Sequence, residues 1–132
     1  MKRSTFLSIT AVLSFAFGAM MFFFPNFAAG FLDIVTTPQT ISVLRGMGGL
    51  IIGSGAINYF LRNQNNSEIL KALLLTNIIT HLLGLSADIW GSLDGALTIS
   101  KMAPVEITHL FVGIGSLIYL LRLKHLEHNG TA

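Results

Sequence analysis

The chain has 132 residues, of which 52% are hydrophobic and only 11% are charged. A soluble domain of this size needs more polar side chains to cover its surface, so the composition excludes an ordinary soluble fold and indicates one domain in lipid. The basic residues that give the net charge of +2 lie at the ends of apolar runs and form no continuous basic face, which excludes a nucleic-acid-binding surface. The absence of cysteine excludes disulfides and thiolate metal sites.

Four apolar runs approach the roughly 20 residues that a bilayer-spanning helix needs. They cover residues 6–24, 41–61, 69–90 and 103–121. Helix breakers and polar residues fill or border the intervening segments, among them Asn65, Gly91 and Pro104. The sequence therefore predicts an all-α fold, an integral membrane four-helix bundle that forms a single domain over residues 1–132.

The first run has the layout of a secretory signal peptide, since basic residues precede it and the small residues 28–30 follow it. Its apolar part is longer than the usual signal core, so we expect a span that is retained. Beyond Pro25, a short segment carries Phe27 and Phe31. It either lies along the membrane interface or forms an ordinary ordered loop.

Basic residues predict the orientation of the four spans. One side of the membrane would hold six of them: Lys2, Arg3, Arg62, Lys71, Arg122 and Lys124. The other side would hold Lys101, while Arg45 lies within a span. Cytoplasmic segments are enriched in Lys and Arg, so both termini are expected in the cytoplasm and the protein in the cytoplasmic (inner) membrane. Tyr59 and Tyr119 then fall near the inner interface and Trp90 near the outer one, where such rings concentrate.

Polar and small residues share one face of each span when residues are placed 100° apart. In chain order the four stripes are Ala11, Ser14 and Gly18; Arg45, Gly49, Gly53 and Ala56; Asn77, His81, Gly84, Asp88 and Gly91; and Glu106, His109, Gly113 and Ser116. Lipid is a poor environment for such stripes, so we expect all four to face the interior of the bundle.

Depth brings the charged members of these stripes together. Arg45, Asp88, Glu106 and His109 fall in the outer third of the membrane, and His81 lies about 10 Å deeper than Asp88. Arginine suits carboxylates, so Arg45 is expected to pair with Glu106 or Asp88. The predicted ligand-binding residues are Arg45, Asp88, Glu106, His109, His81 and Asn77. The alternative is a structural clamp between helices, with His81 as a hydrogen-bonded core residue.

A pocket with these residues favours a binding or accessory protein over an enzyme. The expected partners are the lipid bilayer, a small polar or amphipathic molecule, and either further copies of the chain or another membrane protein. Two alternatives remain open. His81 or His109 could ligate haem or donate to a quinone in an oxidoreductase subunit, or the titratable residues could form a relay in proton- or ion-coupled transport. The Glu106–His109 spacing resembles half of a di-iron site, but a second such pair is missing, so no metal is predicted.

Two segments resemble the DUF4345 family of small bacterial membrane proteins. The first is the arginine-and-glycine string over residues 44–53, and the second is the stretch from Asp94-Gly95 to Glu106. The resemblance implies a four-helix fold that is distantly similar to DoxX-like proteins, some of which accompany quinone-linked oxidoreductases. It also implies characteristic positions: Arg45, Gly49, Asp94, Gly95 and Glu106. Where relatives often carry arginine in the third helix, this chain has His81 and Asp88.

Overall fold

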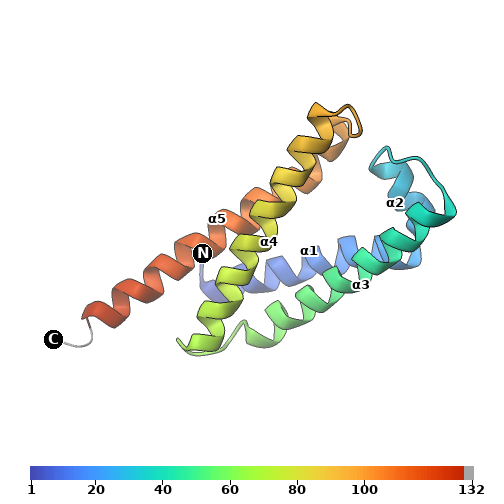
Figure 1. Ribbon diagram of the computed structural model, residues 1–132. Coiled ribbons are helices and arrows are strands. Elements are labelled where there is room, and N and C mark those ends of the chain that lie inside the picture. The colour runs from blue at the N-terminus through green and yellow to red at the C-terminus, as the bar shows by residue number, and fades with distance from the viewer. Residues whose placement is uncertain (130–132) are drawn as a thin grey trace.

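The computed structural model describes the backbone of residues 1–129 and the side chains of that range except those of Ile99 and residues 124–129. The described part is built from helices without strands (Figure 1). In chain order the helices are α1 (Arg3–Phe23), α2 (Pro25–Phe31), α3 (Pro38–Leu61), α4 (Glu68–Leu93) and α5 (Ile99–Asn129). Four segments within this range are long and apolar enough to cross a membrane: α1, α3, α4 and residues 100–123 of α5. The prediction of an all-α fold is confirmed.

Side chains cap the starts of α3 and α4. The hydroxyl of Thr37 accepts a hydrogen bond from the backbone N–H of Thr40 at 3.1 Å, and Pro38 begins α3. The hydroxyl of Ser67 likewise accepts from the N–H of Leu70 at 3.2 Å at the start of α4. Each cap satisfies a backbone donor that the first turn of a helix leaves without a partner.

The Asp94-Gly95 pair ends α4. Asp94 donates its backbone N–H to the carbonyl of Trp90 at 3.0 Å, and Gly95 has a φ of +72°. Glycine adopts this left-handed conformation without the steric cost that a Cβ brings, which is why it so often stops a helix. The end of α4 therefore falls within the segment between the third and fourth apolar runs, residues 91–102.

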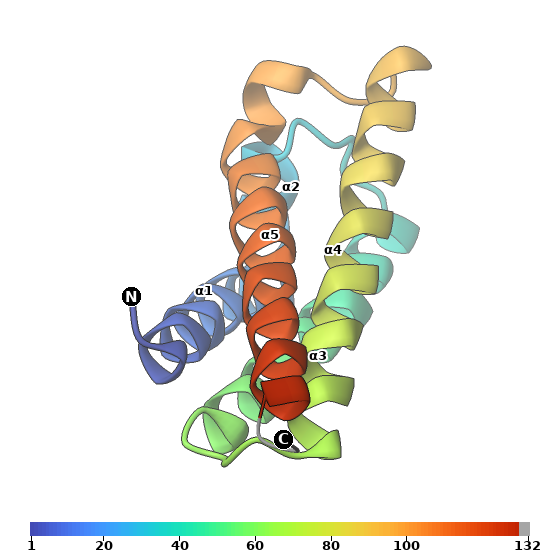
Figure 2. The same ribbon diagram turned by 90° about the vertical axis from the view of Figure 1, so that its left-hand side faces the viewer.

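The helices associate as two antiparallel pairs. Helix α1 packs along α3 and α4 packs along α5, while contacts between the pairs are few. Figure 2 shows α4 and α5 standing next to each other, with α1 and α3 behind them. The α1–α3 crossing is tight because two glycines meet: a Cβ on Gly48 would lie 2.7 Å from the carbonyl oxygen of Gly18. The expected bundle thus takes the form of two hairpins.

A hydrophobic cluster joins the two pairs at each end. At the Arg3 end, where Arg3 donates to Asn66 of the α3–α4 loop, Phe6 contacts residues of α4 and α5. At the α2 end, Met102 of α5 packs against Ala28 and Leu44, and Thr98 donates to Asp33 at 3.0 Å. The position of each end is fixed by residues from distant parts of the sequence.

Three expectations about the elements need correction or completion. The segment after Pro25 is a helix, α2, and its Ala28 and Ala29 are fully buried. Gly91 lies within α4, and Pro104 lies within α5 instead of interrupting the chain before it. Pro104 is the sixth residue of α5, where its missing N–H removes one helical hydrogen bond without ending the helix. It is therefore a poor marker of a boundary.

The interior face predicted for α3 is also wrong. The buried residues of this helix are Leu44, Gly48, Gly55 and Asn58. Gly49 is exposed, and nothing within 4 Å would meet a Cβ on Gly53. The face of α3 that packs against α1 is therefore displaced by one residue from the stripe that contains Arg45, which corresponds to a rotation of about 100° around the helix axis.

Candidate functional site

Two histidines meet at the interface between α4 and α5. The Nδ1 atoms of His81 and His109 lie 2.9 Å apart, and the ring planes make an angle of 62°. Both imidazoles are partly buried. A hydrogen bond between two Nδ1 atoms requires a proton on one ring and a bare nitrogen on the other. The tautomer of one ring therefore determines the tautomer of the other: if one Nδ1 carries a proton, the other Nδ1 must be bare.

Glycines on the facing helices make room for these rings. A Cβ on Gly84 would lie 2.5 Å from Cε1 of His109, so the imidazole occupies the space that a side chain there would need. Gly113 faces His81 in the same way, but a Cβ there would lie 3.6 Å from Cβ of His81, an ordinary contact distance. The stripes of α4 and α5 thus face each other, as the sequence predicted.

Asp88 extends the contact toward the α2 end. Its Oδ2 lies 3.5 Å from Nε2 of His109, whose other ring nitrogen contacts His81. Matching donors to acceptors gives one consistent assignment for neutral rings: His109 carries its proton on Nε2 toward Asp88 and accepts from His81 at Nδ1. Nε2 of His81 is then a bare acceptor at the far end of this chain of groups.

Glu106 completes the group of titratable side chains. It lies close enough to Asp88 for their carboxyl groups to interact. Its Oε2 is buried and has no hydrogen-bond partner among the described residues. Asp88, Glu106, His109 and His81 are therefore brought together as predicted, and this chain of four side chains is called the relay below.

Asn77, another predicted site residue, has a different partner. Its Nδ2 donates to Oδ1 of Asn58 at 2.9 Å, and Nδ2 of Asn58 donates back to Oδ1 of Asn77 at 3.3 Å. Both amides are buried, and they join α3 to α4. The pair has the character of a structural clamp, and its Asn58 half was not among the predicted site residues.

Arg45 does not join the relay. It is exposed on α3, and no ion pair among the described residues includes it. Its neighbour Leu44 is turned inward instead, against α2 and α5. The predicted pairing of Arg45 with Glu106 or Asp88 is wrong because the packing of α1 on α3 is set by Gly48 and Gly55, which point the arginine elsewhere.

An apolar groove opens beside the two histidines, and sequence reasoning missed it. Its volume is about 190 Å³. Its walls are His81 and His109 together with Ile78, Leu82, Leu85, Leu110, Gly113, Ile114 and Leu117. The apolar members recur at helical spacing beside each histidine, which is the signal that could have revealed them. The groove presents two polar rings within a hydrophobic lining, which suits an amphipathic ligand.

The same geometry bears on metal chemistry. A separation of 2.9 Å between the two Nδ1 atoms leaves no space for an iron between them, since each iron–nitrogen bond needs about 2 Å. Across the described part of the chain, no group of three or more His, Asp or Glu residues is placed to hold a metal ion. A haem ligated by these two nitrogens does not fit this arrangement.

Comparison with known proteins gives one match, to the model of a family described as Domain of unknown function (DUF8292), over residues 8–129. No curated protein and no solved structure matches the chain. The expected membership of the DUF4345 family is therefore wrong, and nothing supports a DoxX-like relationship. Arginine among small residues, as over residues 44–53, is a short pattern that helix packing alone can produce in many membrane spans.

Proposed function

The chain belongs to the DUF8292 family, whose description names no activity, and we propose from its own residues that it is a membrane protein that binds a small amphipathic molecule between α4 and α5. One observation carries the proposal: an apolar groove whose polar groups are the paired imidazoles of His81 and His109. An ionisable side chain inside an apolar span is costly to keep, which favours a functional role for the relay over a purely structural one.

The membrane location is part of the proposal and is supported by the exposed side chains. Leu50 and Phe60 on α3 are each 78% exposed, and Leu82 on α4 is 60% exposed. An apolar surface of this extent is unfavourable in water and suits lipid. Arg3 and Arg62 lie at the Arg3 end, which we place on the cytoplasmic side of the inner membrane. An even number of spans then places both termini in the cytoplasm.

The chemistry of the groove defines the ligand class. An apolar tail would contact leucine and isoleucine side chains, and a hydroxyl or amine would donate to the bare Nε2 of His81. His109 accepts the Nδ1 proton of His81 and directs its own Nε2 proton to Asp88, which adjoins Glu106. These partners would hold His81 in the tautomer whose Nε2 is bare. The ligand would enter sideways from the bilayer, since the groove lies along the outside of the α4–α5 pair.

Binding of matched amphiphiles tests this function. With the protein in lipid nanodiscs, 1-dodecanol and dodecylamine should bind, whereas dodecane should bind at least about tenfold more weakly, because a hydrogen bond to imidazole is worth about 1.4 kcal/mol. His81→Leu should remove this preference. Leu117→Trp, which fills the groove, should weaken all three probes.

Thr80→Leu is the matched control for these variants, since Thr80 is exposed on α4 and does not line the groove. It should bind all three probes as the original chain does. Equal binding of dodecane and 1-dodecanol, or an unchanged preference in His81→Leu, would contradict the proposed function.

The Nδ1–Nδ1 contact favours one second candidate, proton transfer along the relay between Glu106 and His81. The amides of Asn58 and Asn77 occupy the next level toward the Arg3 end, and amides exchange protons poorly, so we rank this below binding. Proton flux into vesicles that falls in His109→Leu but not in Thr80→Leu would support this candidate; equal flux in protein-free vesicles would remove it.

A further inference from the structure

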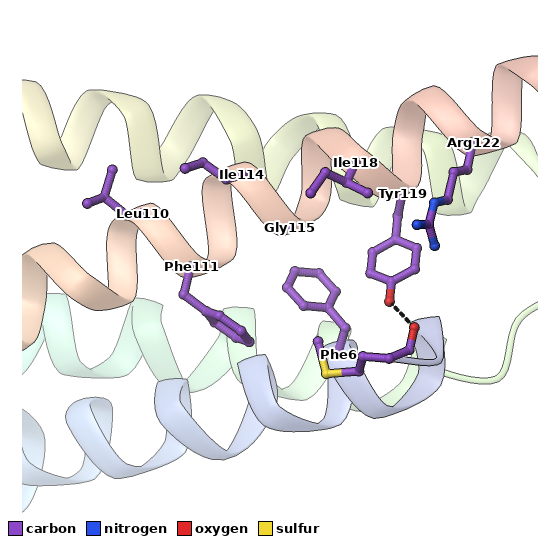
Figure 3. A pocket seen from close by; sticks show the side chains of 9 residues that line it. Phe6, Leu110, Phe111, Ile114, Gly115, Ile118, Tyr119 and Arg122 are labelled. Atoms are coloured by element: carbon purple, nitrogen blue, oxygen red, sulfur yellow. Dashed lines mark hydrogen bonds between the residues drawn. The ribbon is translucent and has the colours of Figure 1, made fainter.

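A second groove runs along α5 toward the Arg3 end and adjoins the histidine groove, with which it shares Leu110 and Ile114 (Figure 3). Its volume is about 430 Å³, within the range of small-molecule sites. Leu110, Ile114 and Ile118 form one wall along α5, and Phe6 of α1 with Phe111 and Tyr119 forms the other. The lining is apolar over this length.

Aromatic packing builds the second wall. The ring of Phe6 is fully buried and lies against Gly115, where a Cβ would come within 2.3 Å of it. Its centroid is 5.5 Å from that of Phe111 and 5.2 Å from that of Tyr119. The hydroxyl of Tyr119 donates to the backbone carbonyl of Met1 at 2.6 Å. These contacts fix the groove where α1 begins and give it a defined shape.

A cation stands at the end of this groove. Arg122 lines it, is exposed, and has its guanidinium 5.7 Å from the centre of the Tyr119 ring. Figure 3 shows the guanidinium on the same side of α5 as Tyr119. Among the described residues, no ion pair includes Arg122, and the exposed Lys2 adjoins Met1 of the lining. An apolar groove that ends in unneutralised positive charge is complementary to a molecule with an apolar chain and an anionic head.

The length of the groove matches one leaflet. The distance along α5 from Leu110 to Arg122 is about 18 Å at the helical rise, close to the ~15 Å that half a bilayer core provides. We propose that this groove binds one anionic phospholipid of the cytoplasmic leaflet, its acyl chain against the exposed side chains of Ile114 and Ile118 and its phosphate at Arg122. The proposal rests on the membrane location given in the proposed function, and its groove shares Leu110 and Ile114 with the histidine groove, but it does not involve the histidines.

Native mass spectrometry of the detergent-solubilised chain tests this site. With 1-palmitoyl-2-oleoyl-phosphatidylglycerol and the matching phosphatidylcholine in turn, the chain should retain the anionic lipid more strongly. Arg122→Gln should weaken that lipid about fivefold, because one basic residue at an anionic surface contributes about 1 kcal/mol. Ile118→Trp should weaken both lipids by filling the groove, whereas the charge variant should leave phosphatidylcholine unchanged.

Arg62→Gln is the matched control, since Arg62 lies at the same end but stacks on Tyr59 outside the groove. It should retain the original preference for the anionic lipid. Equal retention of the two lipids by the original chain, the same loss in Arg62→Gln as in Arg122→Gln, or a lipid-free dimer would overturn the proposal. Loss of amphiphile binding in His81→Leu concerns the other groove, so the two proposals fail independently.

Discussion

At the scale of single residues, the reciprocal amides of Asn58 and Asn77 give the clearest energetic prediction. Replacing either one by leucine leaves the other buried without its partner, so each single variant should lower the free energy of unfolding by about 1–3 kcal/mol. Asn58→Leu combined with Asn77→Leu should cost less than the sum of the two, because the double variant leaves neither amide stranded.

Reversible unfolding of the chain in mixed micelles measures these differences. Asn63→Leu, in the exposed α3–α4 loop, is the control and should change the free energy of unfolding little. Strict additivity of the two single variants would show that the amides do not interact in the folded protein.

Gly84 and Gly113 provide a second pair for comparison at this scale. Gly84→Ala would place a methyl group 2.5 Å from the ring of His109 and should displace it, whereas Gly113→Ala meets His81 at 3.6 Å and should be tolerated. Nitrogen-15 NMR of the labelled imidazoles reads the outcome. The coupling across the Nδ1–Nδ1 hydrogen bond should vanish in the first variant and persist in the second; its persistence in both would contradict the close fit over Gly84.

The residues of the relay were largely predictable from sequence. Asp88 and His81 lie on one face of α4, and Glu106 and His109 lie on one face of α5. Such polar faces on otherwise apolar helices are more favourable against each other than against apolar surroundings, so the sequence predicts that they meet. The charge of Arg45 predicts an inward face for that residue, but the residue is exposed. A long arginine side chain can instead extend from an exposed face toward a polar region, so its charge alone does not identify the buried side.

At the scale of elements, the glycine crossing of α1 and α3 is the feature most sensitive to substitution. Gly48→Ala would bring a methyl group to 2.7 Å from backbone atoms of Gly18 and Phe22, which cannot move away as a side chain can. Such overpacking typically costs about 1–3 kcal/mol. We therefore expect a lower thermal stability for this variant.

Gly46 supplies the matched control in the same helix, since nothing lies within 4 Å of a Cβ placed there. Gly46→Ala should keep or slightly raise the stability, because alanine is favoured over glycine within a helix by about 0.5–1 kcal/mol. Thermal unfolding of the two variants side by side distinguishes the crossing from a general effect of removing glycine; equal stability would show that α1 and α3 do not meet at Gly48.

The elements themselves followed from length and hydropathy, apart from α2. Each apolar run became a helix, and each helix begins one to four residues before its run. Helices α4 and α5 also continue past the last residue of their runs, whereas α1 and α3 do not. Helix α2 escaped prediction because it is short and its buried side consists of Pro25, Ala28 and Ala29, residues that give a weak hydropathy signal.

At the scale of the whole molecule, the partner of each helix could not be predicted from sequence. Apolar helices have no strong preference among apolar neighbours, so close fits such as Gly18 on Gly48 and Phe6 on Gly115 decide the pairing. Both grooves result from this pairing, and neither was visible before it. Hydropathy thus identified the long helices, while steric detail determined where the two grooves lie.

The proposed function requires that α4 and α5 span the membrane and that the histidine groove opens to lipid. The chain has no cysteine, so single cysteines at Asn63, Ala96 and Leu82, all exposed, report the position of each site in right-side-out and inside-out vesicles. The account predicts that a water-soluble maleimide labels Asn63→Cys only from the cytoplasmic side and Ala96→Cys only from the opposite side, and that only a membrane-soluble maleimide labels Leu82→Cys. Labelling of Asn63→Cys and Ala96→Cys from one side, or of Leu82→Cys by the water-soluble reagent, would contradict it.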